Sequence, residues 1–259
     1  MSNIHPTAIV SPKAELADDV TVGPYTIVEE DVVIGKGSQI ASSALIASGA
    51  TLGENVTIAH GAVIATQPQD LKFGGEKTRA VIGDKTVVRE YATINRGTDA
   101  SGQTVIGKDC LLMAYSHVAH DCIIGDNVIL ANSVNLAGHI EIDDHAILGG
   151  VLPVHQFVKI GAHVMIGGGF RVQQDICPYA LVGGYPLKVI GLNALGLKRR
   201  GFNPEVVKQL GKVFKLLFFS SLNTTQAVEK IKSEIEIIPE VQVILDFLER
   251  SNRGIVKAK

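Results

Sequence analysis

An aliphatic side chain recurs at every sixth position of this chain, and this repeat restricts the possible folds more than any other feature. The repeat runs through positions 4–64, 82–94 and 106–172, always as Ile, Leu or Val. A period of six fits neither the 3.6-residue period of a helix nor a plain hairpin, but it fits a short strand plus a turn. Such units bury nothing alone, whereas stacked coils bury a continuous aliphatic column. The repeat therefore predicts a parallel β-helix.

The repeat is interrupted at two places, residues 66–80 and 99–104. An insertion in a solenoid becomes a loop on its surface, because the coils on either side must still stack. The composition agrees with a chain of many tight turns, since glycine occurs 27 times, aromatic residues make up 5% and Trp is absent. The two interruptions are the first places where a binding site or an active site is expected.

The last part of the chain changes character, because the six-residue repeat stops at about residue 187. Asn203 followed by Pro204 is typical of a helix N-cap and the first helical residue, and this helix should end near Phe219. Asn223 offers a second cap, and Pro239 can open a third helix. The sequence thus predicts a β-helix over residues 1–186 and a helical domain over residues 187–259.

Charge and cysteine content exclude several classes of protein. The formal net charge of -2 provides no basic field for nucleic acid or an anionic membrane. Residues 1–10 lack the pattern of a secretory signal, and no apolar stretch is long enough to cross a bilayer, so a cytoplasmic protein is expected. Cys110, Cys122 and Cys177 have no metal-binding spacing and are interpreted as small core residues. No metal or bound cofactor is implied.

Eight longer motifs go beyond the repeat. They are HPTA at 5–8, QDLK at 69–72, NRGT at 95–98, LLM at 111–113, HVAHDC at 117–122, LAGH at 136–139, VHQF at 154–157 and GLKRRGF at 196–202. With them the chain resembles the UDP-N-acetylglucosamine 3-O-acyltransferase family of hexapeptide-repeat enzymes over nearly its whole length. The resemblance implies a left-handed coil, although parallel crossovers in general are right-handed. It also implies a homotrimer that moves a 3-hydroxyacyl group from acyl carrier protein to the 3-hydroxyl of UDP-N-acetylglucosamine, the first step of lipid A synthesis.

The length of one coil predicts that four residues lie in one cluster. Three six-residue units make one coil in the family, so residues 18 apart are stacked, and His120 and Asp121 should lie over Gly138 and His139. A sugar hydroxyl needs a base before it can attack a thioester, and an imidazole with a pKa near ~6.5 suits this task. The resemblance implies His120 as that base and the Gly138 N–H as the donor to the oxyanion. Asp121 is a candidate for orienting the histidines, provided that a turn brings adjacent side chains together.

The resemblance also assigns residues that contact the substrates. Asp70 and Lys72 are expected to bind the acceptor, and Gly168 is expected to admit a long acyl chain because it has no side chain. Leu195 departs from the family pattern, in which an acidic residue is frequent, so the nucleotide contacts there are expected to differ. The remaining expected contacts are Gln69, His117, His139 and His155 around the substrate and acyl chain, and Gln156, Asn193, Arg199 and Arg200 at the nucleotide.

Other interpretations remain open at this stage. His5, His60, His145 and His163 are interpreted as structural, with the last two stacked. A related acyltransferase could use an amine acceptor, either a 3-amino sugar nucleotide or the acceptor of an N-acyltransferase in the same pathway. The same coil also supports zinc enzymes of the carbonic-anhydrase kind, for which His117, His120 and His139 would be the ligands. A β-helical scaffold without activity would leave the clustered His, Asp and Gly residues without a purpose.

Overall fold

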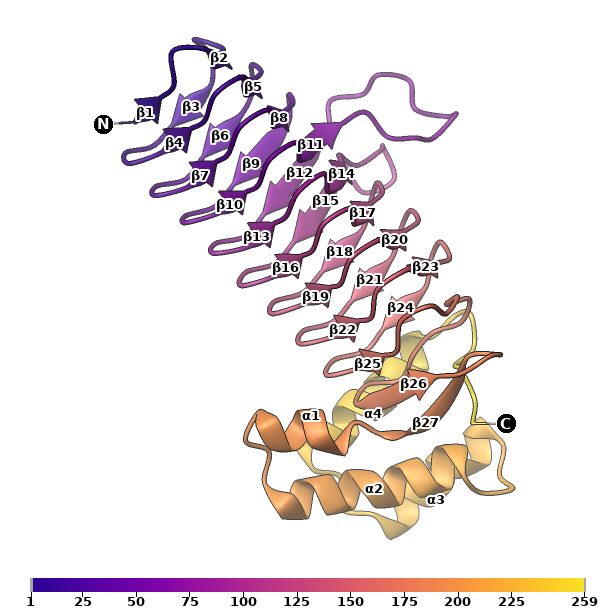
Figure 1. Ribbon diagram of the computed structural model, residues 1–259. Coiled ribbons are helices and arrows are strands. Elements are labelled where there is room, and N and C mark those ends of the chain that lie inside the picture. The colour runs from indigo at the N-terminus through magenta and orange to yellow at the C-terminus, as the bar shows by residue number, and fades with distance from the viewer. Residues whose placement is uncertain (1, 259) are drawn as a thin grey trace.

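The computed structural model describes residues 2–258 and has the shape of a long three-sided prism with helices at one end (Figure 1). Three parallel sheets form its sides, and consecutive strands visit them in turn, so that each coil adds one strand to every sheet. The prediction of a parallel β-helix is confirmed. Met1 and Lys259, the outer ends of the two predicted domains, lie outside the described residues.

The strands are short and are named here by sheet. Sheet A consists of β1 (Asn3–Ile4), β4 (Thr21–Val22), β7 (Gln39–Ile40), β10 (Thr57–Ile58), β13 (Val87–Val88), β16 (Leu111–Leu112), β19 (Ile129–Leu130), β22 (Ile147–Leu148), β25 (Met165–Ile166), β26 (Ala180–Gly183) and β27 (Lys188–Leu192). Sheet B consists of β2 (Ile9–Val10), β5 (Ile27–Val28), β8 (Leu45–Ile46), β11 (Val63–Thr66), β14 (Thr93–Asn95), β17 (His117–Val118), β20 (Val134–Leu136) and β23 (Leu152–Val154). Sheet C consists of β3 (Glu15–Leu16), β6 (Val33–Ile34), β9 (Ala50–Leu52), β12 (Arg79–Ile82), β15 (Gln103–Ile106), β18 (Ile123–Ile124), β21 (Glu141–Ile142) and β24 (Lys159–Ile160).

The aliphatic residues of the repeat fill the interior of the prism. From Val22 to Val172, none of them is more than 3% exposed. The first coil differs, because no coil covers it: Ile4 is 43% exposed, and Val10 and Leu16 are only partly buried. The cysteines are buried and unpaired, as predicted. The repeat thus supplies the hydrophobic free energy of the coils, which amounts to roughly 1.5–3 kcal/mol for each fully buried aliphatic side chain.

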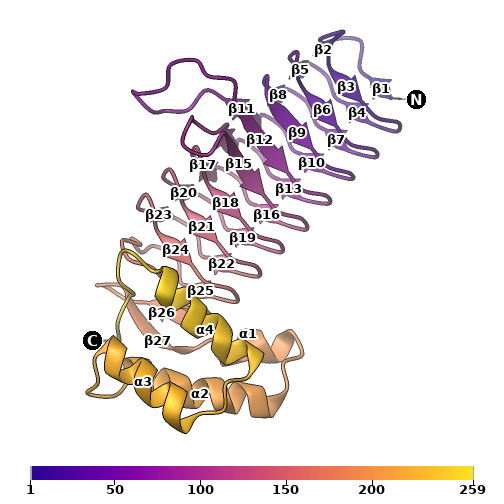
Figure 2. The ribbon, with the colours of Figure 1, turned by 180° about the vertical axis from the view of Figure 1, so that it is seen from behind.

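The turns between strands form three edges, called here AB, BC and CA after the sheets that they join. Both interruptions of the repeat lie on edge BC. The long loop (residues 67–78) connects β11 to β12, and the short loop (residues 96–102) connects β14 to β15. The long loop projects outward from the coils (Figures 1 and 2). Its base is held by the Asn95 amide, which donates to the Gln67 carbonyl at 3.1 Å, and by the Arg96 guanidinium, which lies 5.4 Å from the centre of the Phe73 ring.

The carboxyl-terminal part begins with a hairpin that the repeat did not predict. Strand β26 continues sheet A in parallel, and β27 then pairs antiparallel to β26 at the end of the sheet. Four helices follow: α1 (Ala194–Arg199), α2 (Pro204–Phe218), α3 (Thr224–Glu234) and α4 (Pro239–Arg250). The predicted caps Asn203 and Asn223 accept backbone N–H groups, and α4 starts at Pro239, as predicted. Among the helices of residues 2–258, none has the length and apolar character that a bilayer span requires.

A buried carboxylate joins the end of the chain to the coils. The side chain of Asp175 accepts a hydrogen bond from the Lys159 N–H at 2.8 Å and another from the Ser251 hydroxyl at 2.7 Å, and the residue is 0% exposed. We expect Asp175→Ala to lower the free energy of unfolding by about 2–4 kcal/mol, because it leaves a buried N–H without a partner. Urea denaturation measures this loss. Ser251→Ala, the matched control, should cost about 1 kcal/mol; equal losses in the two variants would contradict the role given to Asp175.

Candidate active site

The turn between β17 and β18 carries His120 and Asp121, and the turn one coil further along carries Gly138 and His139. The His139 N–H donates to the His120 carbonyl at 3.0 Å, which fixes the spacing of the two turns. The His120 ring covers Gly138 closely: a Cβ atom on Gly138 would meet ring atoms Cε1 and Nε2 at 2.6 and 2.8 Å. Any larger residue at position 138 would therefore displace the imidazole. The stacking that the 18-residue period predicts brings these four residues together.

Asp121 is the centre of a hydrogen-bond cluster. Its backbone has a φ of 59°, the left-handed conformation of a turn residue, so its side chain lies on the same side as that of His120. Oδ1 accepts from the Thr98 N–H at 2.9 Å and from the Ser101 hydroxyl at 2.5 Å, and Oδ2 accepts from the Thr98 hydroxyl at 2.7 Å and from His120 Nδ1 at 2.8 Å. Burial alone would raise the pKa of Asp121, but these hydrogen bonds outweigh it and lower the pKa to about 2.

The protonation of this cluster decides which nitrogen of His120 is free. At a pH near 7 Asp121 is ionised and can only accept hydrogen bonds, so Nδ1 of His120 must carry the proton. Nε2 then keeps its lone pair and lies on the side of Gly138. The His139 ring packs edge-on against His120 with ring centres 5.1 Å apart and stacks on Phe157 at 4.5 Å. The arrangement presents one imidazole nitrogen as a proton acceptor.

A backbone donor lies beside this nitrogen. Within residues 2–258, no group accepts a hydrogen bond from the Gly138 N–H, whereas the Gly138 carbonyl accepts from the Phe157 N–H at 3.2 Å. In several other turns, the first residue also has a backbone N–H without an acceptor. Among the glycines of the described turns, only Gly138 lies under an imidazole ring, so that a lone pair and a donor are available to one bound substrate.

The neighbouring expected contacts surround this cluster on sheet B and edge BC. His117 lies on the outer face of β17, with Nδ1 at 2.7 Å from the Thr93 hydroxyl, and burial followed by the nearby His120 lowers its pKa. His155 and Gln156 form the next turn of the same column, and Gln156 is exposed. Gln69, Asp70 and Lys72 lie on the long loop, where the Asp70 carboxylate accepts the Lys72 N–H at 3.0 Å. This loop is on edge BC and projects outward from the coils between β11 and β12 (Figure 1).

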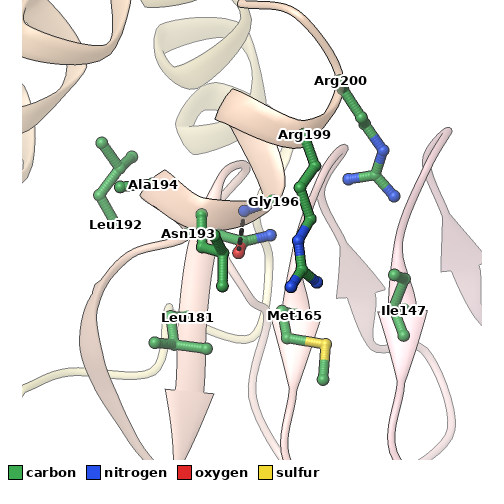
Figure 3. Close-up of a pocket in the computed structure, with 10 residues that line it drawn as sticks. Ile147, Met165, Leu181, Leu192, Asn193, Ala194, Gly196, Arg199 and Arg200 are labelled. Atoms are coloured by element: carbon green, nitrogen blue, oxygen red, sulfur yellow. Dashed lines mark hydrogen bonds between the residues drawn. The ribbon is translucent and has the colours of Figure 1, made fainter.

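A second group of expected contacts lies on a different edge. Asn193 caps α1 through the Gly196 N–H and donates to the His163 carbonyl at 2.9 Å, on edge CA. Arg200 donates to the His145 carbonyl at 2.9 Å, and its buried Nη1 has no acceptor within residues 2–258. Arg199 is exposed and extends along the wall of a cavity of about 380 Å³ (Figure 3).

This cavity combines an apolar floor with basic groups. Ile147, Met165 and Leu181 form the floor on the outer face of sheet A, and Leu195 also lines the cavity. Gly168 lies on the third edge, AB, where a Cβ atom would meet the Gly150 carbonyl oxygen at 2.8 Å. One chain therefore does not bring all the expected contacts into one place. It carries the histidine cluster on edge BC and the basic cavity beside edge CA.

The structural histidines behave as predicted where a contact describes them. His145 and His163 stack with ring centres 4.7 Å apart, and Tyr179 continues the stack beyond His163. Burial, followed by the charges of His145 and Arg200, lowers the pKa of His163 to about 4. This ring is therefore neutral at physiological pH and can pack in an apolar column.

A metal site is not the best interpretation of the histidine cluster. The ligand atoms of His120, Asp121 and His139 lie within 4.8 Å of one another, a different trio from the three histidines that the sequence suggested. However, four hydrogen bonds already occupy the Asp121 carboxylate, and Nδ1 of His117 is engaged with Thr93. A zinc ion needs ligands that are free to bind it.

Sequence reasoning missed Thr98 and Ser101, the two hydroxyl residues that bond Asp121. A signal for them existed. The residue 18 positions before Asp121 is Gln103, at the end of the second interruption, so the short loop had to lie next to Asp121. Which of its polar side chains would reach the carboxylate depends on the loop conformation, which the repeat does not determine.

Comparisons with known sequences show which family the chain resembles. A family model described as the second domain of UDP-N-acetylglucosamine O-acyltransferase matches residues 175–256, and the bacterial transferase hexapeptide model matches residues 31–66 and 103–138. The chain is 63% identical over 255 residues to the acyl-[acyl-carrier-protein]–UDP-N-acetylglucosamine O-acyltransferase of Chlorobium phaeobacteroides, a match that covers 98% of this chain and 97% of the relative.

Solved structures show the same fold. A UDP-N-acetylglucosamine acyltransferase from Bacteroides fragilis superposes with a TM-score of 0.96 at 42% identity, covering 98% of this chain and 99% of that one. A related structure from Acinetobacter baumannii gives a TM-score of 0.95 at 41% identity, with coverage of 98% and 99%. The shared architecture is the left-handed parallel β-helix with carboxyl-terminal helices, so the hand expected from the resemblance is confirmed.

Proposed function

Because this chain belongs to the UDP-N-acetylglucosamine O-acyltransferase family, we propose that it transfers a 3-hydroxyacyl group from acyl carrier protein to the 3-hydroxyl of UDP-N-acetylglucosamine, the first step of lipid A synthesis. The observation that carries the mechanism is the pairing of a free imidazole nitrogen on His120 with the free N–H of Gly138. A base and an oxyanion donor are the two groups that acyl transfer to a hydroxyl requires.

The reaction proceeds as follows in this proposal. Nε2 of His120 takes the proton of the sugar 3-hydroxyl, and the hydroxyl oxygen attacks the thioester carbonyl carbon. The Gly138 N–H stabilises the oxyanion that forms on the carbonyl oxygen. When this intermediate collapses, the carbon–sulfur bond breaks, and the imidazolium of His120 returns its proton to the thiolate of the carrier protein. Asp121 orients the ring through Nδ1 and stabilises its protonated form.

An assay of the purified protein tests this function. It contains UDP-N-acetylglucosamine and acyl carrier protein loaded with a 3-hydroxyacyl chain, and mass spectrometry with fragmentation identifies the product. We expect one acyl group in ester linkage at the 3-position. In a competition experiment, a 3-amino sugar nucleotide should react more slowly. A preference for that amine acceptor would replace the hydroxyl acceptor in the proposal, and no product with either acceptor would contradict acyl transfer.

The basic cavity is proposed to hold the nucleotide. The Arg199 guanidinium is exposed beside it, and Arg200 lines the cavity as a second cation for the phosphates. Asn193 is used by two structural hydrogen bonds and supports the cavity wall. Leu195, which also lines the cavity, is proposed to offer an apolar contact there. Gln69, Asp70 and Lys72 of the long loop are proposed to bind the sugar, and His117, His139 and His155 to surround the substrate and acyl chain near His120. Gln156 is proposed to contact the nucleotide.

We propose a homotrimer, and the separation of the two half-sites supports contact between copies. His120 lies on edge BC, whereas Arg199 and Arg200 lie beside edge CA, so a complete site needs two copies of the chain. Sheet A supports this, because the outward-facing residues of five successive strands are apolar and only half-buried in one chain; they are Val87, Leu111, Ile129, Ile147 and Met165. We propose a cytoplasmic trimer in which sheet A of each copy packs against the next copy.

Gly168 is proposed to allow the site to accept a long acyl chain. We expect Gly168→Met to lower the rate with the longest accepted acyl chain by about tenfold or more and to favour chains shorter by several carbons, because the new side chain fills space beside Gly150. Carrier proteins loaded with chains of graded length measure the preference. Gly211→Met, on α2, is the control, because a Cβ atom there meets nothing within 4 Å and its backbone is helical. An unchanged length profile in Gly168→Met would contradict the role.

A further inference from the structure

The short loop is built as a rigid support for Asp121. The Gly102 N–H donates to the Thr98 carbonyl at 2.8 Å, which closes the loop on itself. The Thr78 hydroxyl fixes the entry by donating to the Gly97 carbonyl at 2.6 Å. A Cβ on Gly97 would meet the Gln103 backbone N at 2.3 Å, so only glycine allows this close return of the chain. The loop is thus closed and anchored independently of any substrate.

Three of the four donors to the Asp121 carboxylate come from this loop. They are the N–H and hydroxyl of Thr98 and the hydroxyl of Ser101. The Asp121 N–H in turn donates to the Thr104 hydroxyl at 2.9 Å, so the residue is held from both its backbone and its side chain. The carboxylate is 0% exposed, so each donor that is removed takes away a hydrogen bond that bulk water does not already supply.

We propose that Thr98 and Ser101 are positioning residues of acyl transfer, whose hydroxyls hold the Asp121 carboxylate in one orientation and thereby fix which nitrogen of His120 carries the proton. The inference rests on the proposed function and adds to it the residues that position Asp121. The hydroxyls also donate hydrogen bonds to the carboxylate, which weakens its electrostatic attraction for a protonated His120. A base must be unprotonated at working pH. A carboxylate whose charge is partly neutralised by hydrogen bonds stabilises the protonated imidazole less, and so leaves more of His120 unprotonated.

Several titratable and charged side chains also face Asp121. His120 contacts the carboxylate directly, and Nε2 of His139 lies 3.8 Å from Oδ2. Glu141, Lys159 and Arg253 line the cavity beside Asp121. Lys159 pairs with Glu141, and Arg253 donates to the Gln173 carbonyl at 3.2 Å. The loop hydroxyls are therefore the groups whose removal changes the carboxylate most directly while leaving this charge pattern intact.

The experiment compares variants that lose a hydroxyl with variants that keep it. Thr98→Val and Ser101→Ala, singly and together, remove the donors, while Thr98→Ser and Ser101→Thr keep them. We expect the double loss to lower kcat by about tenfold, with KM for both substrates changing by less than about threefold. The acid side of the pH profile should move to higher pH by about half a unit, because a carboxylate with fewer donors stabilises the protonated imidazole. The hydroxyl-retaining variants should stay near wild type.

A second readout does not depend on acyl transfer. Nitrogen-15 NMR of the histidine rings, with the His120 signals assigned by their loss in His120→Asn, reports which nitrogen carries the proton. Wild type should show Nδ1 protonated, and the double variant a mixture of tautomers. Equal tautomers in both proteins, or a loss of kcat with an unmoved pH profile, would overturn the inference. Ser101→Ala changes an exposed residue, so it answers the question even if Thr98→Val unfolds the chain. A wild type without transferase activity would refute the proposed function, while the ring spectra would still decide the inference.

Discussion

Replacing His120 with alanine is expected to lower kcat on the order of 10³-fold while the chain stays folded. The imidazole is the proposed proton acceptor, and a positioned general base contributes about 10²–10⁴ to the rate. Its side chain lies outside the aliphatic interior, in a turn, and is 13% exposed. Its loss therefore removes a functional group without opening a cavity in the core. Steady-state kinetics with saturating substrates measures the effect, and the thermal transition verifies the fold.

His5→Gln provides the matched control. His5 lies on the first coil, is exposed, and has its ring nitrogen at 2.9 Å from the Thr7 hydroxyl. Its replacement should leave kcat within about twofold of wild type. A folded His120→Ala protein with nearly full activity would end the proposed mechanism, because no other described imidazole has both a carboxylate on one nitrogen and a free donor beside the other.

Asp121→Asn is expected to reduce kcat by about 10²–10³, close to the effect of losing His120 itself. The reason is geometric. The Thr98 N–H, which meets Oδ1 in the native chain, can only donate, so the amide oxygen of the new side chain must occupy that place. The amide NH₂ then replaces Oδ2 and points its hydrogen at Nδ1 of His120. Nδ1 must become an acceptor, the proton moves to Nε2, and the base is lost.

Kinetics and ring NMR together test this second effect. The NMR spectrum should show the His120 proton on Nε2 in Asp121→Asn and on Nδ1 in wild type. Asp126→Asn is the control, because Asp126 is also a turn carboxylate that accepts a backbone N–H, from Lys108 at 2.7 Å, but lies away from the histidine cluster. It should leave kcat unchanged. Full activity in Asp121→Asn would show that the tautomer of His120 does not limit the reaction.

Most of the fold could be predicted from the six-residue repeat, because each aliphatic side chain has only one buried position available in a stacked coil. The same spacing brought His120 and Asp121 next to Gly138 and His139 without further information. The hand of the coil came from family resemblance alone, because the general preference for right-handed crossovers gives the opposite hand. The hairpin of β26 and β27 and the six-residue helix α1 were missed, since neither follows the repeat, and α1, although Asn193 caps it, is too short to show a helical period.

The parts of the site that the sequence did not determine depend on backbone conformation. Adjacent side chains on a strand point apart, and only the left-handed φ of Asp121 turns its carboxylate toward His120. Thr98 and Ser101 reach this carboxylate because the short loop closes on itself. Likewise, the position of Arg199 beside another edge follows from the hairpin that precedes α1. Each of these features is local, and none has a sequence period.

The most direct test of a site shared between copies mixes two inactive chains. One chain carries His120→Ala, the other carries Arg199→Ala with Arg200→Ala, and co-expression with different affinity tags allows mixed trimers to be isolated. In either mixed composition, one of the three contacts between copies joins an intact His120 to an intact arginine pair. We predict about one third of wild-type activity from mixed trimers and almost none from either chain alone. Mixed trimers without activity would contradict the account, because each chain would then have to contain its own complete site.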